Sequence, residues 1–203
     1  MTLQRQSWLK RSAWRDENAT QLAEFAITLP LLIFFVVGIF DFSGAFTLKQ
    51  KLTNIARDTA RAAAADPATD LSSALPYSVS DAFYIFDNYL GANNINDCGI
   101  ALPTAGAQAL TWQSTVASST SSPCGITFTI NRGYYLPLAA TSTPPTTTCT
   151  PLQPSAGATQ VVATCVSIQY TYQWHFGQVA SLLGRNAVLP TSISAVAVAM
   201  NEN

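Results

Sequence analysis

Cysteine is the most informative of the few residue types in this 203-residue chain that could do chemistry. The four cysteines are Cys98, Cys124, Cys149 and Cys165. They include no CxxC pair and have no histidine nearby in the sequence, which argues against a zinc site. An even number of cysteines in an exported region instead indicates disulfide bonds, because disulfides persist in oxidising compartments. We expect two disulfides.

Four cysteines can pair in three ways. The pairs Cys98–Cys124 and Cys149–Cys165 are favoured because each joins neighbouring cysteines and encloses a stretch rich in loop-forming residues. Buried free thiols are the alternative.

Residues for catalysis are sparse. His175 is the only histidine, and it lies between Trp174 and Phe176, a setting typical of a structural side chain. The sequence has no G-x-S-x-G serine, no paired acids on one helix face after Asp87 and no glycine-rich phosphate loop. We therefore expect no enzymatic activity, no bound metal and no cofactor.

Charge is scarce and unevenly placed. Charged residues make up 10% of the chain, against about 25% in typical soluble domains. Beyond Arg61 the only basic residues are Arg132 and Arg185, and the surface there should be rich in hydroxyl and amide groups. No basic patch is present in that region, so a nucleic-acid partner is not expected.

Glu24 is the unusual carboxylate, because it lies directly before an apolar run over residues 25–40 that only Thr28 and Pro30 interrupt. A helix needs about 20 mostly apolar residues to cross a bilayer. With Asp41 near an interface, we expect a transmembrane segment at about residues 25–46. A carboxylate at the edge of such a segment is costly unless it lies near headgroups or is paired.

Residues 1–19 form a basic leader, which the positive-inside rule alone does not orient, because Lys49, Lys51, Arg57 and Arg61 flank the other end of the span. We expect the leader in the cytoplasm. The cysteines after the span need an oxidising side, which favours the same orientation. A cleavable signal peptide with a cut near Ser43-Gly44-Ala45 is the alternative. The long leader, Pro30 and Asp41 argue against it.

The helix should continue beyond the membrane. Leu48, Leu52, Ile55, Ala56 and Thr59 recur at helical spacing on one face, while charged and amide residues cover the others. Asp66-Pro67 ends the pattern, since the residue before proline avoids helical angles. We therefore expect one long helix over residues 20–66.

The remaining residues 67–203 should form an extracytoplasmic α+β domain with three to five antiparallel strands and the long helix on one face. A second helix is expected over residues 79–90, with Ser80 as its N-cap. Residues 93–122 and 141–159 read as irregular. The strand signals lie at residues 126–135, 160–174 and 188–200, the last apolar on both faces.

The N-terminal part resembles the TadE-like proteins of the tight-adherence (Flp) pilus system, which are pseudopilins related to type IV pilins. Glu24-Phe25, with Pro30 five residues later, matches the family start. Gly38-Ile39-Phe40-Asp41-Phe42 is similar to its next segment, and residues 54–63 (NIARDTARAA) to its arginine-containing segment. The resemblance covers about residues 15–65.

The resemblance implies a single-pass protein of the bacterial inner membrane, with a pilin-like fold, that assists pilus assembly and surface adherence. Its implied partners are the membrane, other pilins or pseudopilins, the assembly machinery and a prepilin peptidase. Cleavage would follow Ala19, which stands where the family has glycine, and would leave a free amine on Thr20. Glu24, next to Phe25, would pair with that amine on a neighbouring subunit.

A different class of function is the alternative. The chain could be a membrane-anchored or secreted β-rich binding domain whose uncharged, aromatic-bearing face recognises a surface polysaccharide or a protein.

Overall fold

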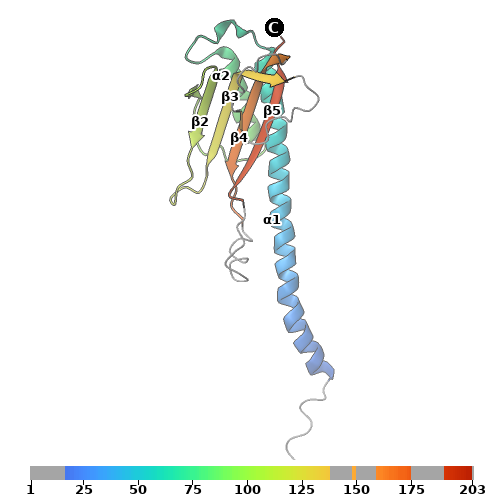
Figure 1. Cartoon of the computed structure of the whole chain (residues 1–203). Coiled ribbons are helices and arrows are strands. Elements are labelled where there is room, and N and C mark those ends of the chain that lie inside the picture. The colour runs from blue at the N-terminus through green and yellow to red at the C-terminus, as the bar shows by residue number, and fades with distance from the viewer. Residues whose placement is uncertain (1–16, 138–147, 150–158, 175–189, 203) are drawn as a thin grey trace, which may run out of the picture.

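One long helix, α1 (Glu17–Ala65), organises the structure (Figure 1). The computed structural model describes residues 17–137, 148–149, 159–174 and 190–202, with the backbone alone for residues 17–19. The 49 residues of α1 measure about 73 Å at 1.5 Å per residue. The helix ends before Asp66-Pro67 as predicted, and it already includes the three residues before Thr20.

The rest of the described chain contributes a five-stranded sheet in the order β1-β2-β3-β4-β5, with every neighbouring pair antiparallel. This confirms the α+β prediction of a long helix with a small antiparallel sheet. The strands are β1 (Thr104–Ala105), β2 (Thr111–Val116), β3 (Ile126–Pro137), β4 (Gln160–Thr171) and β5 (Ser192–Met200).

The second half of α1 and the shorter helix α2 (Tyr77–Ala92) pack against one face of this sheet (Figure 1). The predicted apolar face of α1 is confirmed, because Leu52, Ile55, Ala56 and Thr59 are fully buried and Leu48 packs against the same core. Phe86 of α2 stacks on Phe128 of β3 with ring centroids 4.7 Å apart. Burial of these aromatic and aliphatic groups is the main force that holds the domain together.

The start of α2 differs from the prediction. The helix begins at Tyr77 after Pro76, and its first backbone N–H donates to Asp70 Oδ2 at 2.5 Å. Proline suits the beginning of a helix because its angle φ is already helical and its missing N–H is not needed there. Ser80 therefore lies inside the helix, where its hydroxyl donates to the Tyr77 carbonyl, and it is not the cap.

The expectation of an irregular segment over residues 93–122 was wrong, because β1 and β2 lie within it. Trp112 of β2 is buried, and its indole N–H donates to the Ala74 carbonyl at 3.0 Å. Its strand is defined by pairing with β3, where Trp112 lies opposite Ile130. A short strand with polar alternate positions shows little local signal without that partner.

The later strands are shorter than predicted. The strand β4 ends at Thr171, and β5 begins at Ser192. Ala195 and Ala197 of β5 face the helices and are buried, whereas Val196 and Val198 are only partly buried on the opposite face. The expectation that β5 is buried on both sides was therefore too strong. His175 and most of the predicted loop over residues 141–159 lie outside the described residues.

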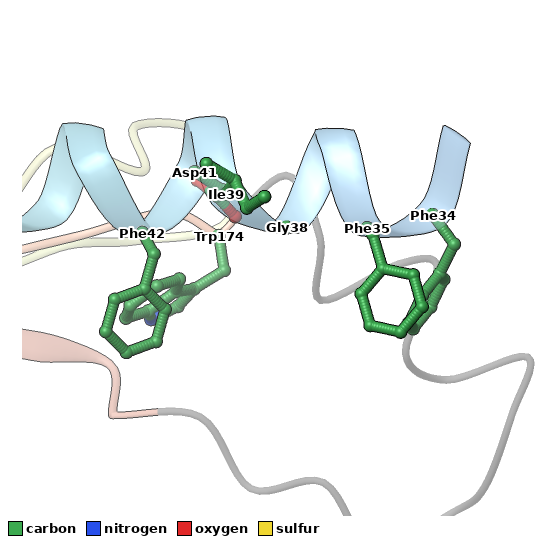
Figure 2. Close-up of a pocket in the computed structure, with 7 residues that line it drawn as sticks. All are labelled: Phe34, Phe35, Gly38, Ile39, Asp41, Phe42 and Trp174. Atoms are coloured by element: carbon green, nitrogen blue, oxygen red, sulfur yellow. The ribbon is translucent and has the colours of Figure 1, made fainter. Parts of the chain in front are cut away.

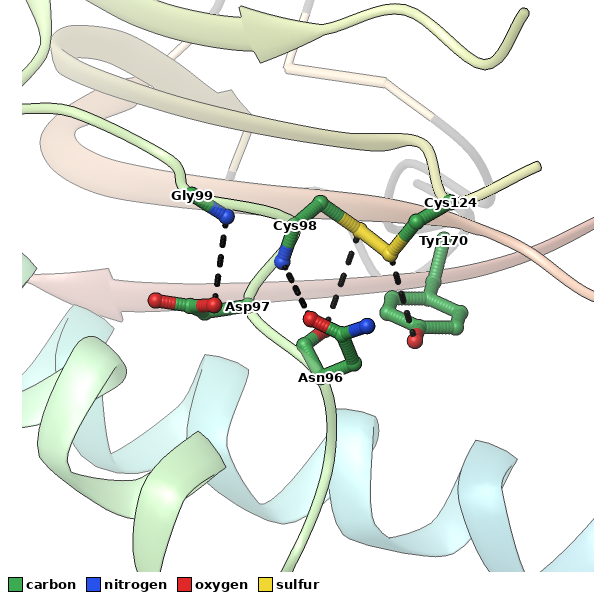
Figure 3. The surroundings of a disulfide bond; sticks show 6 residues. All are labelled: Asn96, Asp97, Cys98, Gly99, Cys124 and Tyr170. Carbon is green, nitrogen blue, oxygen red and sulfur yellow. Dashed lines mark hydrogen bonds between the residues drawn. A yellow bond between two sulfur atoms is a disulfide. The ribbon is translucent and has the colours of Figure 1, made fainter. Parts of the chain in front are cut away.

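Both predicted disulfides are present. Cys98–Cys124 joins the segment after α2 to the start of β3, with the two Cα atoms 5.5 Å apart (Figure 3). Cys98 has a positive φ of 60°, and its N–H donates to Asn96 Oδ1 at 2.9 Å. Cys149–Cys165 links the described pair of residues after β3 to the middle of β4. Cross-links of this kind stabilise small exported domains that carry few charges.

Candidate assembly helix and its junction with the domain

The first half of α1 is apolar on every side and does not enter the core of the domain. One helix of the described chain, Thr20–Ala65, is long and apolar enough to cross a membrane. A helix that is hydrophobic all round needs lipid or other helices about it. The large apolar side chains of this half that remain exposed are Leu22, Phe25, Ile27, Leu29, Leu31, Leu32, Ile33, Phe35, Val36, Ile39 and Phe40.

The predicted assembly residues lie at the start of this half. Thr20, Glu24 and Phe25 are all exposed, and Thr20 and Glu24 lie four residues apart on one side of the helix. The Ala19–Thr20 bond, where cleavage is predicted, falls in the first turn of α1. Helix ends fray readily, so this bond is more accessible than one in the helix interior.

Thr28 and Pro30 fit the apolar surroundings. The Thr28 hydroxyl donates to the Glu24 carbonyl at 3.0 Å, so it satisfies its own polarity inside the helix. Pro30 lies within α1 and has no N–H to give the preceding turn. The helix continues through this position, which membrane helices tolerate.

Asp41 is a buried residue of α1 that forms hydrogen bonds with the domain. Only 7% of the Asp41 surface is exposed. The Tyr172 hydroxyl, just after β4, lies 3.0 Å from the Asp41 backbone oxygen and 3.1 Å from its Oδ1, and it donates there. Gly44 permits this approach, because a Cβ at that position would lie 3.0 Å from the same hydroxyl. Asp41 thus belongs to the junction between helix and domain.

Trp174 completes the junction. Its ring lies 5.7 Å from that of Phe42 and 4.9 Å from that of Tyr172, and its indole N–H donates to the Pro190 carbonyl. Figure 2 shows Trp174 beside Phe42, with Phe34 and Phe35 further along the helix. These residues line an open, mostly apolar pocket of ≈ 370 Å³. Its mostly apolar lining suits a hydrocarbon group.

The junction lies at the C-terminal end of the mostly exposed first half of α1, residues 20–40, here called the bare half or bare helix. Asp41 and Ala45 are buried against the domain, whereas most side chains of residues 20–40 are exposed in the described chain. Residues 22–40 measure about 28 Å as a helix, close to the roughly 30 Å of a bilayer core. Tyr172 and Trp174 lie at the end of this stretch, beside Asp41 and Phe42.

A comparison with known protein families finds a match within α1. Residues 20–61 match the family model described as TadE-like protein. This segment of the chain is TadE-like. The match confirms, over this segment, the resemblance seen in the sequence. No curated protein and no solved structure matches the chain.

Packing against the domain explains the residue pattern in the second half of the TadE-like segment. Ala56 and Ala60 are almost fully buried, while Arg57 and Arg61 are exposed. Small side chains let the helix approach β4 and β5 closely. In the earlier half, Glu24 and Phe25 are exposed in the described chain, so packing within the described domain does not account for that part of the pattern.

Tyr172 and Trp174 were missed as junction residues, although they were recognised as part of an alternating strand. The only signal in the sequence is the run of aromatic residues that continues past the end of β4. Burial raises the pKa of the Tyr172 hydroxyl, and the hydrogen bond to Asp41 and its charge act in the same direction. Tyr172 therefore stays neutral and donates its proton at all physiological pH values.

Removal of the Tyr172 hydroxyl should loosen the junction. For Tyr172→Phe we expect the free energy of unfolding to fall by about 1–3 kcal/mol, because a hydrogen bond to a buried carboxylate is lost. Thermal unfolding of the detergent-solubilised chain measures this, with Tyr77→Phe as the matched control, since Tyr77 is 81% exposed. Equal stability of the two variants would contradict a structural role for the contact.

The raised pKa of Tyr172 also predicts how the stability of the fold changes with pH. The neutral hydroxyl is favoured in the folded state, so its contribution is complete below the unfolded pKa of about 10. It is lost as the pH rises through the higher folded value. The difference in stability between wild type and Tyr172→Phe should accordingly narrow in strong alkali.

Proposed function

We propose that this chain is a non-enzymatic, membrane-anchored pseudopilin-like protein that assists assembly of the Tad (Flp) pilus and thereby surface adherence. The observation that carries the proposal is the division of α1. Its first half is bare and apolar, its second half is built into the domain core, and the TadE-like match spans both. A helix of this kind holds a domain at a membrane while its apolar half remains free to pack beside other helices.

The proposed location is the bacterial inner membrane, crossed once, with residues 1–19 in the cytoplasm and the domain outside. The two disulfides support this orientation, because such bonds persist in oxidising compartments. Tyr172 of the domain contacts α1 at Asp41, just after the mostly exposed stretch. The domain therefore lies directly on the outer side of the proposed span.

The proposed partners are other pilins or pseudopilins, the pilus assembly machinery and a prepilin peptidase that cuts after Ala19. Exposed Glu24 and Phe25 are placed for a contact between helices within the membrane. A carboxylate there is stabilised by a cationic partner, which the amine of a cleaved Thr20 on a neighbouring subunit would provide.

A replacement of the bare helix tests the proposal. In a deletion strain, the full chain should restore pilus display. A chimera with an unrelated leucine- and alanine-rich span in place of residues 20–40 should insert in the membrane and fail to restore display. Restoration by the chimera would show that the first half of α1 is only an anchor, and the proposed assembly role would fall. Immunoblots of the membrane fraction control for expression.

A further inference from the structure

The sheet has one face covered by α1 and α2 and an opposite face, here called the outer face, that carries polar side chains. Across the register, Gln113, Thr129 and Ser167 form one row on β2, β3 and β4. Thr115, Thr127, Gln169 and Ser194 form the next row, which reaches β5. Every residue in the two rows bears a neutral hydroxyl or amide group.

These groups are free to bind a ligand. The side chains of Gln113, Thr127, Thr129 and Gln169 form no hydrogen bond with any other residue that the structure describes. Hydroxyl groups donate one hydrogen bond and accept two, and amides both donate and accept. The outer face therefore presents a dense array of donors and acceptors without a fixed charge.

The array lies in a groove. Except for Ser194, its side chains line a concave space of ≈ 440 Å³, together with residues 106–108, Thr111, Thr148 and Cys149. Ligand sites commonly have volumes of about 300–1,000 Å³. One wall turns sharply at Gly106, whose N–H donates to the Thr111 carbonyl at 2.7 Å. A Cβ at Gly106 would lie 3.2 Å from that same carbonyl oxygen, so a larger residue would crowd the turn.

The opposite wall is anchored to the sheet. Cys149 is bonded to Cys165 of β4, and it is almost fully buried. The side-chain amide of Asn131 on β3 donates to the Cys149 carbonyl at 3.4 Å. Cys149 is thus held by two neighbouring strands, so this side of the groove is part of the folded domain.

The residue types that line the groove indicate which class of ligand it could bind. Centres of protein interfaces are rich in Tyr, Trp, Phe, Met and Arg, and none of these is among the described residues that line the groove. No lysine, arginine or acidic residue lines it either, so it has nothing to neutralise an anionic or a cationic polymer. A neutral, hydroxyl-rich molecule matches both the lack of charge and the spacing of donors and acceptors.

We propose that the outer face binds a neutral glycan in this groove. Sugar hydroxyl groups exchange hydrogen bonds with Gln113, Thr129 and Gln169, while Cys149 and Ala107 supply small apolar contacts. The proposal does not depend on the TadE-like segment, because none of the groove residues lies within residues 20–61. Binding measured in vitro therefore stands or falls separately from pilus display.

The test uses the full chain in detergent micelles on an array of immobilised neutral oligosaccharides, with sialylated and sulfated oligosaccharides alongside. We expect binding to a group of neutral glycans and none to the charged ones. Thr129→Val, which removes one hydroxyl at nearly constant volume, should weaken the affinity for the best neutral glycan about threefold to tenfold. Gln113→Ala with Thr129→Val should weaken it tenfold or more.

Ser194→Val is the control, because it also removes a hydroxyl from the outer face, in the second row on β5 and outside the groove lining. Its affinity should stay within twofold of wild type, and thermal unfolding should show all three variants folded. Absence of binding to any neutral glycan would overturn the proposal, as would equal binding to charged glycans or equal affinity of Thr129→Val and Ser194→Val. Self-association that Thr129→Val abolishes would overturn it too, by assigning the face to a second copy.

Discussion

Glu24→Gln is expected to abolish pilus assembly while leaving the fold and membrane insertion of the chain unchanged. Glu24 is exposed and lies well before Asp41, where Tyr172 of the domain contacts the helix. The substitution therefore removes nothing from the core. A neutral amide is also less costly than a carboxylate near hydrocarbon, so insertion should be equal or better.

We expect Glu24→Gln to stop assembly because the predicted partner of Glu24, the Thr20 amine of a neighbouring subunit, would lose its counter-charge. If the Thr20 amine of one subunit meets Glu24 of the next, the glutamine leaves that amine uncompensated in apolar surroundings. Removal of one member of a buried ion pair costs about 3–5 kcal/mol. Such a cost recurs at every contact between subunits, which suffices to stop assembly.

Two variants at the predicted cut serve as controls for processing. Ala19→Gly restores the residue typical of the family and should be processed at least as well as wild type. Ala19→Phe should block processing through its bulk. The comparison is pilus display together with the mass of the mature chain. Normal display by Glu24→Gln, with no change of mass in any variant, would reduce Glu24 to an interfacial residue.

Loss of the Cys149–Cys165 disulfide should be the most damaging change to the domain. The two cysteines are 16 residues apart in sequence, and a loop of that size corresponds to about 3 kcal/mol in the chain-entropy model. Cys149 and Cys165 also pack with Tyr134 and Ala163 in a cluster on the outer face. Cys149→Ala with Cys165→Ala should therefore lose that amount plus some packing.

Urea unfolding of the detergent-solubilised chain measures the loss, as a shift of the midpoint. The Cys98→Ala, Cys124→Ala pair is the comparison, because its bond closes a loop of similar length, with a sequence separation of 26. Reduced wild type should be destabilised at least as much as either variant pair. An unchanged midpoint for the Cys149 and Cys165 variant would contradict a stabilising role for that bond.

The features that sequence predicted best are those set by local pattern. The apolar run, the helical spacing of Leu52 and Ile55 and the break at Asp66-Pro67 define α1 almost to the residue. The strong alternation of β4 works in the same way, since β-branched and aromatic residues favour a half-buried strand. Adjacent cysteines gave the correct disulfide pairing because each closes a short loop within the domain.

The features that sequence could not predict depend on contacts between distant segments. Trp112 becomes part of a strand through pairing with Ile130 and through its hydrogen bond to Ala74. Asp41 reads as a polar break in an apolar run until the Tyr172 hydroxyl, far along the chain, is placed against it. The groove on the outer face could likewise be predicted only with knowledge of the register of β2, β3 and β4.

The central claim is that the bare half of α1 stays in the mature protein as its membrane anchor. It is tested most directly by carbonate extraction of membranes followed by N-terminal sequencing of the extracted chain. Our account predicts that the chain remains in the carbonate-resistant fraction and that its sequence begins at Thr20, or earlier if it is not processed. A soluble mature chain that begins near Phe46 would contradict it.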